Sequence, residues 1–169
     1  VGTVSDVVPL RGVNRALVSQ GLRVLAQRRN PGLVALADVA RLTGPPDAAA
    51  VGFALGPRIN AGGRVGQADL GYRLLATDDP AEASAIAQAL DRLNGERREI
   101  ETKVLAEATA QAEDQAKAAT ALGQPLVFVA GRGWHPGVIG IVAARLREKF
   151  ERPAVVVALA EPGSGDCKG

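Results

Sequence analysis

Two apolar runs, Leu126-Val127-Phe128-Val129-Ala130 and Ala154-Val155-Val156-Val157-Ala158-Leu159, decide the fold of the last part of the chain. Each run is almost continuously apolar, as strands buried on both faces are. Between them, residues 138–150 have the length and apolar spacing of a helix, and residues 133–137 form a turn before it. A strand, a helix and a second strand in this order predict a β-α-β unit with parallel strands.

Upstream of this unit, the sequence predicts one long helix. Asp79-Pro80-Ala81-Glu82 places Asp at the N-cap, Pro at the first helical position and Glu at the third, which is the pattern of a capping box. The helix is expected from Pro80 to about Ala118; a two-helix hairpin broken at Asn94-Gly95 is the alternative. We favour one helix between two globular bodies because residues 78–119 carry ten acidic and five basic side chains, which suit a mostly solvated helix.

The first 77 residues predict a short opening strand followed by four short helices. The strand is expected within Val1–Leu10, and the helices over 14–28, 32–42, 48–55 and 67–76, with a glycine-rich turn before the last. The predicted fold class is therefore α/β, with a helical segment trailing a parallel-sheet catalytic domain, a long connector helix and a second α/β domain.

Composition excludes several classes of protein. Hydrophobic residues make up 47% of the 169 residues and aromatic residues 3%, so the core must be aliphatic. No apolar run approaches the roughly 18 residues of a membrane-spanning helix. The single cysteine, Cys167, excludes an internal disulfide and favours a reducing compartment, so we expect a cytoplasmic protein. Because the chain starts at Val1 and has no Met, we expect it to be part of a longer protein.

Basic side chains are concentrated at the two ends of the chain. Residues 1–77 carry nine Arg against four Asp, and sixteen of the twenty basic residues are Arg. The planar guanidinium suits bidentate contacts to phosphate, which favours a nucleic-acid partner. Genome composition is the alternative cause of this Arg content.

Three segments have residues suited to chemistry. Asp6 follows the predicted opening strand, where α/β enzymes expose catalytic groups, and its carboxylate suits Mg²⁺ or Mn²⁺ only together with further ligands. The alternative for Asp6 is a turn or helix cap. In the glycine-rich segment, Arg58, Asn60 and Arg64 suit contacts to an anion such as a phosphodiester, or the two Arg pair with acids.

The third segment, 131–140, runs from a glycine-bounded loop into a predicted helix N-terminus, which favours negative charge. His135 would contact phosphate there and Trp134 would stack on a base. Helix capping or packing is the alternative role of His135.

Four collinear stretches of the chain resemble the RecJ family of single-strand-specific 5′ to 3′ exonucleases, within the DHH phosphoesterase superfamily. They are Gly2-Thr3-Val4-Ser5-Asp6-Val7-Val8-Pro9-Leu10, residues 55–66, Leu93-Asn94-Gly95-Glu96-Arg97-Arg98-Glu99-Ile100-Glu101, and residues 133–146. Ser5 and Gly62 each stand where the family more often has Ala. The family's Asp-rich, Asp-His-His, Gly-Arg-Ser and Gly-Gly-His motifs are absent from these 169 residues.

The resemblance implies a metal-dependent exonuclease acting on single-stranded DNA in repair and recombination. Two Mn²⁺ or Mg²⁺ ions would act, with Asp6 as one catalytic ligand and the others outside this chain. It implies DNA contacts by Arg58, Asn60, Arg64 and His135, and helicase or single-strand-binding proteins as partners.

The resemblance also implies three parts: residues 1–77 ending the DHH domain, 78–120 as the connector, and 121–169 starting the DHH-associated nucleic-acid-binding domain. Residues 1–169 alone are then expected to be inactive. The alternatives are a DHH phosphodiesterase for oligonucleotides or cyclic dinucleotides, and a non-catalytic nucleic-acid-binding relative.

Overall fold

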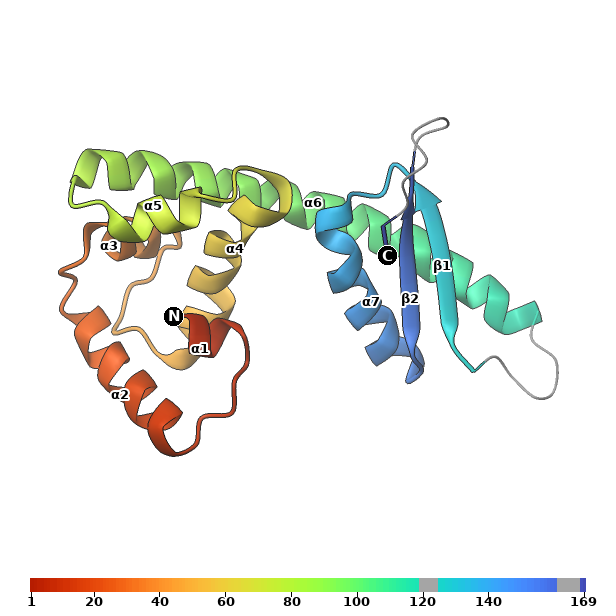
Figure 1. The fold of residues 1–169 in the computed structure, drawn as a ribbon, viewed down its shortest axis with the longest axis horizontal. Coiled ribbons are helices and arrows are strands. Elements are labelled where there is room, and N and C mark those ends of the chain that lie inside the picture. Colours follow the sequence, from red (N-terminus) through yellow and green to blue (C-terminus); the bar gives the residue numbers. More distant parts are fainter. Residues whose placement is uncertain (119–124, 161–167) are drawn as a thin grey trace. The chain divides into compact units, whose positions relative to one another are not determined.

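The computed structural model describes residues 1–118, 125–160 and 168–169. They form two compact units, Val1–Gly95 and Glu96–Gly169, and each has its own apolar core (Figure 1). Helix α6 (Pro80–Ala118) begins in the first unit and ends in the second. The predicted loop over 161–166 and the predicted strand start at Cys167 lie outside the described residues.

The first unit contains only helices as regular structure. They are α1 (Gly2–Ser5), α2 (Gly12–Ala26), α3 (Pro31–Val39), the short π-helix η1 (Ala50–Leu55), α4 (Gly56–Val65), α5 (Leu70–Ala76) and the first part of α6. The core consists of aliphatic side chains: Leu36, Val51, Leu55, Leu74, Ala83, Ile86, Ala87 and Leu90. The last four lie on α6 at three-four spacing, so this part of α6 packs as an amphipathic helix.

Two predictions for the first unit are wrong. The opening residues form the helix Gly2–Ser5 and not a strand, because four β-branched or small residues do not decide between the two, and no strand of residues 1–95 is present to pair with them. The glycine-rich residues predicted as a turn form α4. Its glycines serve close packing: a Cβ at Gly56 would lie 2.2 Å from Oγ of Ser5, and one at Gly62 would lie 2.9 Å from the carbonyl oxygen of Gln67.

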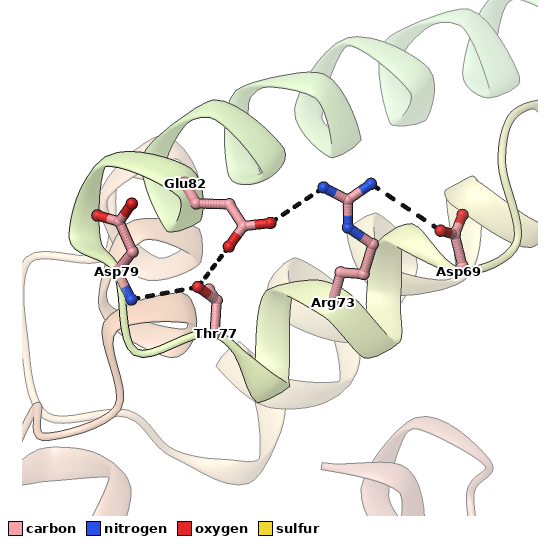
Figure 2. A network of polar contacts seen from close by, with 5 residues as sticks. All are labelled: Asp69, Arg73, Thr77, Asp79 and Glu82. Atoms are coloured by element: carbon pink, nitrogen blue, oxygen red, sulfur yellow. Dashed lines mark hydrogen bonds and ion pairs between the residues drawn. The ribbon is translucent and has the colours of Figure 1, made fainter.

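The start of α6 is fixed by a network of polar side chains (Figure 2). Asp79 is the N-cap and accepts from the Ala81 N–H at 2.8 Å, as predicted. The Glu82 carboxylate does not accept a hydrogen bond directly from the Asp79 backbone N–H, as it would in a capping box. Instead, the Asp79 N–H donates to Oγ1 of Thr77 at 3.2 Å, and the Thr77 hydroxyl donates to Glu82 at 2.6 Å. Arg73 on α5 donates to the other Glu82 oxygen at 3.0 Å, which ties α5 to α6.

Helix α6 itself confirms the prediction of one long helix. It runs without interruption for 39 residues from Pro80 to Ala118, through Asn94 and Gly95. The two-helix hairpin is therefore excluded. Despite this length, α6 is too polar to cross a membrane, and no other helix in the described parts of the chain is long and apolar enough to do so.

The second unit confirms the predicted β-α-β unit and the α/β class. Strand β1 (Val127–Arg132) pairs in parallel with β2 (Ala154–Leu159), with Val127 opposite Ala154, and α7 (Pro136–Phe150) connects them. The buried core draws on both helices and both strands: Val104, Ala108, Ala112, Val127, Val129, Trp134, Val138, Ile139, Val142, Leu146, Val156 and Ala158.

The outer edge of β1 is covered by side chains of α6. Gln111 accepts from the Ala130 N–H at 3.2 Å and donates to the Ala130 carbonyl at 3.1 Å. One helical turn later, Gln115 donates to the Phe128 carbonyl. These amides satisfy backbone groups that an edge strand otherwise leaves open. At the opposite edge of the sheet, Ala158 of β2 forms an antiparallel bridge with Lys168.

Candidate metal and nucleic-acid site

Asp6 lies at the C-terminal end of α1, where its backbone N–H donates to the Gly2 carbonyl at 2.9 Å and its side chain is exposed. The next residue, Val7, has φ +54° and is 86% exposed. A β-branched residue rarely adopts this left-handed conformation, and such strain gathers at functional sites. The chain therefore turns sharply directly after an accessible carboxylate.

The Asp6 carboxylate fits one coordination position of a hard divalent cation. A complete site needs several such ligands. Within residues 1–118, 125–160 and 168–169, no group of three or more His, Cys, Asp or Glu side chains is placed to hold a metal ion. The described residues therefore offer one ligand and not a metal centre.

The end of α1 packs directly on the start of α4. Ser5, next to Asp6, lies so close to Gly56 that no side chain fits at position 56. This contact brings two of the predicted segments together within the first unit: the one that carries Asp6 and the one that carries Arg58, Asn60 and Arg64.

Arg58 on α4 points to acidic and carbonyl oxygens of its own unit. Its Nε donates to Oδ1 of Asp91 on α6 at 2.8 Å, and its Nη1 donates to the Ala54 carbonyl at 2.8 Å. The side chain is 15% exposed. Arg58 thus makes the ion pair with an acid that was the alternative to a phosphate contact.

Asn60 and Arg64 lie one turn apart on α4, so they share one face of the helix, and both are exposed. Arg58 is two residues before Asn60 and lies on another face. The structure therefore places Asn60 and Arg64 together on the surface and separates Arg58 from them.

His135 belongs to the second unit, where it is the N-cap of α7. Its Nδ1 accepts from the Gly137 N–H at 3.0 Å, which is the capping role given as the alternative to phosphate binding. Trp134 is only 5% exposed, and its Nε1–H donates to Glu107 on α6 at 2.8 Å. The expectation that Trp134 stacks on a base is therefore wrong, because the indole packs in the core of the unit.

Sequence reasoning missed the acidic partners on α6. Asp91 binds Arg58, Glu107 binds Trp134, and Glu101 accepts from the buried Arg97 and lies 4.0 Å from Arg145 on α7. Asp91 and Glu107 each stand beside a buried apolar residue of α6. An acid at the border of the apolar stripe is the signal that would have indicated a packing role.

Known proteins and solved structures are similar to this chain in both sequence and fold. Single-stranded-DNA-specific exonuclease RecJ of Dickeya dadantii is 43% identical over 171 residues, which is 100% of this chain and 29% of that protein. Crystal structures of RecJ from Thermus thermophilus superpose with TM-scores of 0.81 in complex with Mn²⁺ and 0.82 in complex with Mg²⁺. Their identities are 42% and 41%, and both cover 93% of this chain.

The similarity extends over the whole chain but over only part of its relatives. The chain spans 29% of the Dickeya protein and 23% and 24% of the two Thermus structures. No protein-family model matches the chain. Sequence identity above 40% together with the shared fold identifies this chain, over all of its length, as homologous to a segment of the RecJ single-stranded-DNA-specific exonucleases.

Proposed function

We propose that this chain is part of a metal-dependent 5′ to 3′ exonuclease that hydrolyses phosphodiesters of single-stranded DNA by a two-metal mechanism, in repair and recombination. Homology to proteins named single-stranded-DNA-specific exonuclease and the Mn²⁺ and Mg²⁺ complexes of a relative support this proposal. Within the chain, the observation that carries it is the exposed Asp6 carboxylate, next to the contact between α1 and α4.

In this proposal, Asp6 supplies one oxygen ligand to Mn²⁺ or Mg²⁺, and the other ligands lie outside residues 1–169. Bound ions of this kind activate water and neutralise the charge that develops on a phosphate. The contribution of this chain is to hold the Asp6 carboxylate in place, through the packing of Ser5 on Gly56. The 169 residues alone are expected to be inactive.

The proposal divides the chain into three parts. Residues 1–77 would end the DHH catalytic domain, 78–120 would form the connector, and 121–169 would start the DHH-associated nucleic-acid-binding domain. The continuous helix α6 and the β-α-β unit support this division.

The proposed DNA contacts are Arg58, Asn60, Arg64 and His135. Exposure of Asn60 and Arg64 on one face of α4 supports a contact to the DNA backbone there. For Arg58, a phosphate would compete with Asp91 and the Ala54 carbonyl. For His135, the nitrogen that does not cap α7, Nε2, is the atom proposed to reach a phosphate.

The setting of the activity is also part of the proposal. The complete protein would act on single-stranded DNA in the cytoplasm, together with repair proteins such as a helicase or single-strand-binding protein. Residues 1–77 carry nine Arg, and the helices of the first unit expose part of their surface. Arg side chains on such a surface can neutralise DNA phosphates, which supports a DNA partner.

The test is the variant Asp6→Ala in the complete protein, with Asp78→Asn as a control at another exposed acid of the same unit. Asp6→Ala should abolish Mn²⁺-dependent release of nucleotides from single-stranded DNA and weaken Mn²⁺ binding in calorimetry, while DNA binding persists. Normal turnover of Asp6→Ala would refute the ligand role. Substrates labelled at the 5′ or the 3′ end give the polarity, and preference for dinucleotides over long strands would favour an oligonucleotide phosphodiesterase.

A further inference from the structure

Helix α2 carries arginines along one side, and the DNA contacts proposed above do not include them. Arg15, Ser19 and Arg23 are spaced four residues apart, so they follow one another along the helix surface. Arg11, the N-cap residue of α2, precedes Arg15 by the same interval, and all four residues are exposed. We call Arg11, Arg15 and Arg23 the α2 arginines; at 1.5 Å per residue they extend over roughly 18 Å.

The surroundings of the α2 arginines lack acidic side chains. Between Asp6 and Asp38 the sequence contains no Asp or Glu. Two other exposed arginines of the first unit are paired with acids: Arg28 with Asp38, and Arg73 with Glu82 at 3.0 Å. None of the α2 arginines forms an ion pair with any residue that the structure describes. Their positive charge is therefore available to a partner.

The side of α2 that carries these arginines differs from its two apolar sides. Leu22 and Leu25 are half-buried and pack on the core of the first unit. Leu17 and Val24 are exposed on a second side. Because Leu17 is two residues after Arg15, it lies on nearly the opposite side of the helix. A neighbour that covers Leu17 and Val24 would therefore leave Arg15 facing away from it.

The α2 arginines begin close to the proposed metal ligand. Arg11 follows Asp6 by five residues, and a short loop joins α1 to α2 (Figure 1). Five residues of chain reach at most about 18 Å, so the Cα atoms of Asp6 and Arg11 lie within that distance of each other. A strand of DNA whose end is held by a metal ion at Asp6 would need to extend only this far to meet the first of the α2 arginines.

We propose that the α2 arginines bind the phosphate backbone of single-stranded DNA as the strand leads away from Asp6. The guanidinium group forms bidentate hydrogen bonds with phosphate, and Arg keeps its charge at any physiological pH. Helix α2 has no aromatic side chain on which a base could stack, so the contact is expected to be independent of base sequence. The identity of the strand as single-stranded DNA rests on the proposed function.

The test is the double variant Arg15→Gln with Arg23→Gln in the complete protein. Binding of a single-stranded oligothymidylate is followed by fluorescence anisotropy over a range of salt concentrations, with EDTA present so that no strand is hydrolysed. Loss of two phosphate contacts should reduce the slope of log K against log salt by about 1.4, at about 0.7 per phosphate, and weaken binding roughly tenfold. The control, Arg28→Gln with Arg73→Gln, removes the same charge from arginines that acids already hold, and should change the slope much less.

An unchanged slope in the Arg15 and Arg23 variant would overturn the inference, and so would equal changes in the two double variants. Weaker binding of a blunt duplex alone would assign these arginines to duplex DNA instead. Because EDTA removes the metal ions, the measurement does not depend on the ligand role of Asp6. A complete protein that shows the change in slope but hydrolyses no single-stranded DNA would refute the proposed function and support this inference; hydrolysis with an unchanged slope would do the reverse.

Discussion

Asp91 on α6 accepts a hydrogen bond at 2.8 Å from Nε of Arg58 on α4, which lies 33 residues earlier in the sequence. The same guanidinium reaches the Ala54 carbonyl, so one side chain joins α4 to the residues that precede it and to the long helix. The ion pair therefore acts together with the packing of Gly56 and Gly62 in positioning α4, which carries the exposed Asn60 and Arg64.

The variant Asp91→Ala should destabilise the first unit by about 1–2 kcal/mol, because it leaves the largely buried Arg58 without its acid. Urea unfolding of residues 1–169 measures the effect. Asp38→Ala is the matched control, since it breaks the exposed Arg28–Asp38 pair and should cost less than about 1 kcal/mol. Equal losses in the two variants would contradict a special role for Arg58–Asp91.

Glu82 should make the stability of the first unit dependent on pH. The Thr77 hydroxyl, followed by the Arg73 guanidinium, lowers the pKa of Glu82 below its ordinary value of 4.5. A carboxyl with a lowered folded-state pKa stabilises the fold above its unfolded pKa, and this stabilisation is lost as the pH falls through the folded pKa. The difference in melting temperature between the wild type and Glu82→Gln should therefore be present at pH 7 and shrink below about pH 4.5.

Carboxyl NMR titration provides the direct check on Glu82. Its midpoint should lie below 4.5 in the wild type and rise in Thr77→Val, which removes the main hydrogen bond. A midpoint that does not respond to Thr77→Val would show that the network in Figure 2 does not act on Glu82 in solution.

Gly32→Ala should strongly destabilise the first unit. A Cβ at this position would lie 1.8 Å from the backbone carbonyl oxygen of Leu74, so α3 and α5 would have to separate. The expected cost is about 2–3 kcal/mol in chemical unfolding. Gly95→Ala is the control, because nothing lies near its Cβ and helix propensity should stabilise by up to about 1 kcal/mol. A tolerated Gly32→Ala would mean that α3 and α5 are not packed as described.

Gln111→Ala should expose the backbone N–H and carbonyl of Ala130, at the outer edge of β1, to solvent. It removes both side-chain bonds to the Ala130 backbone, each worth about 1 kcal/mol net, and the Ala130 amide should exchange with solvent faster. Gln88→Ala, on an exposed part of α6, should leave this amide unchanged. Loss of the edge protection should also appear as concentration-dependent association in sedimentation; an unchanged exchange rate would argue against the role of Gln111.

Ser5→Ala should stabilise the first unit by about 1 kcal/mol. The Oγ of Ser5 is buried and has no hydrogen-bond partner among the described residues, so the variant removes a polar group that burial penalises. Ser19→Ala, at an exposed position, should change stability by no more than about 0.5 kcal/mol. Destabilisation by Ser5→Ala would show that the hydroxyl has a partner in solution.

The sequence predicted the elements that have strong local signals. Continuous apolar runs specified β1 and β2, and Asp79-Pro80 specified the start of α6. The prediction was wrong where glycine can either permit a turn or allow two helices to pack closely. In residues 56–66 it indicated a turn, but Gly56 and Gly62 are needed for close approach between helices, and that requirement appears only when distant residues such as Ser5 are in place.

The sequence indicated which residues belong to the candidate site, but it did not indicate their contacts. Asp6 is exposed beside α4, which is compatible with its proposed role, and Asn60 and Arg64 share an exposed face. The sequence shows that Asp91 and Glu107 border the apolar stripe of α6, but it does not show that they bind Arg58 and Trp134, which are 33 and 27 residues away and come close only on folding.

The amides of Gln111 and Gln115 have a consequence for how the sheet of the second unit can extend. Since helix side chains already occupy backbone groups of β1, a further strand has one place to join, alongside β2. Lys168 already makes the first contact there, and it runs antiparallel to Ala158. Further strands can therefore pair only with the free edge of β2. A strand added through the contact with Lys168 would be antiparallel to β2, and the parallel pair would become a mixed sheet.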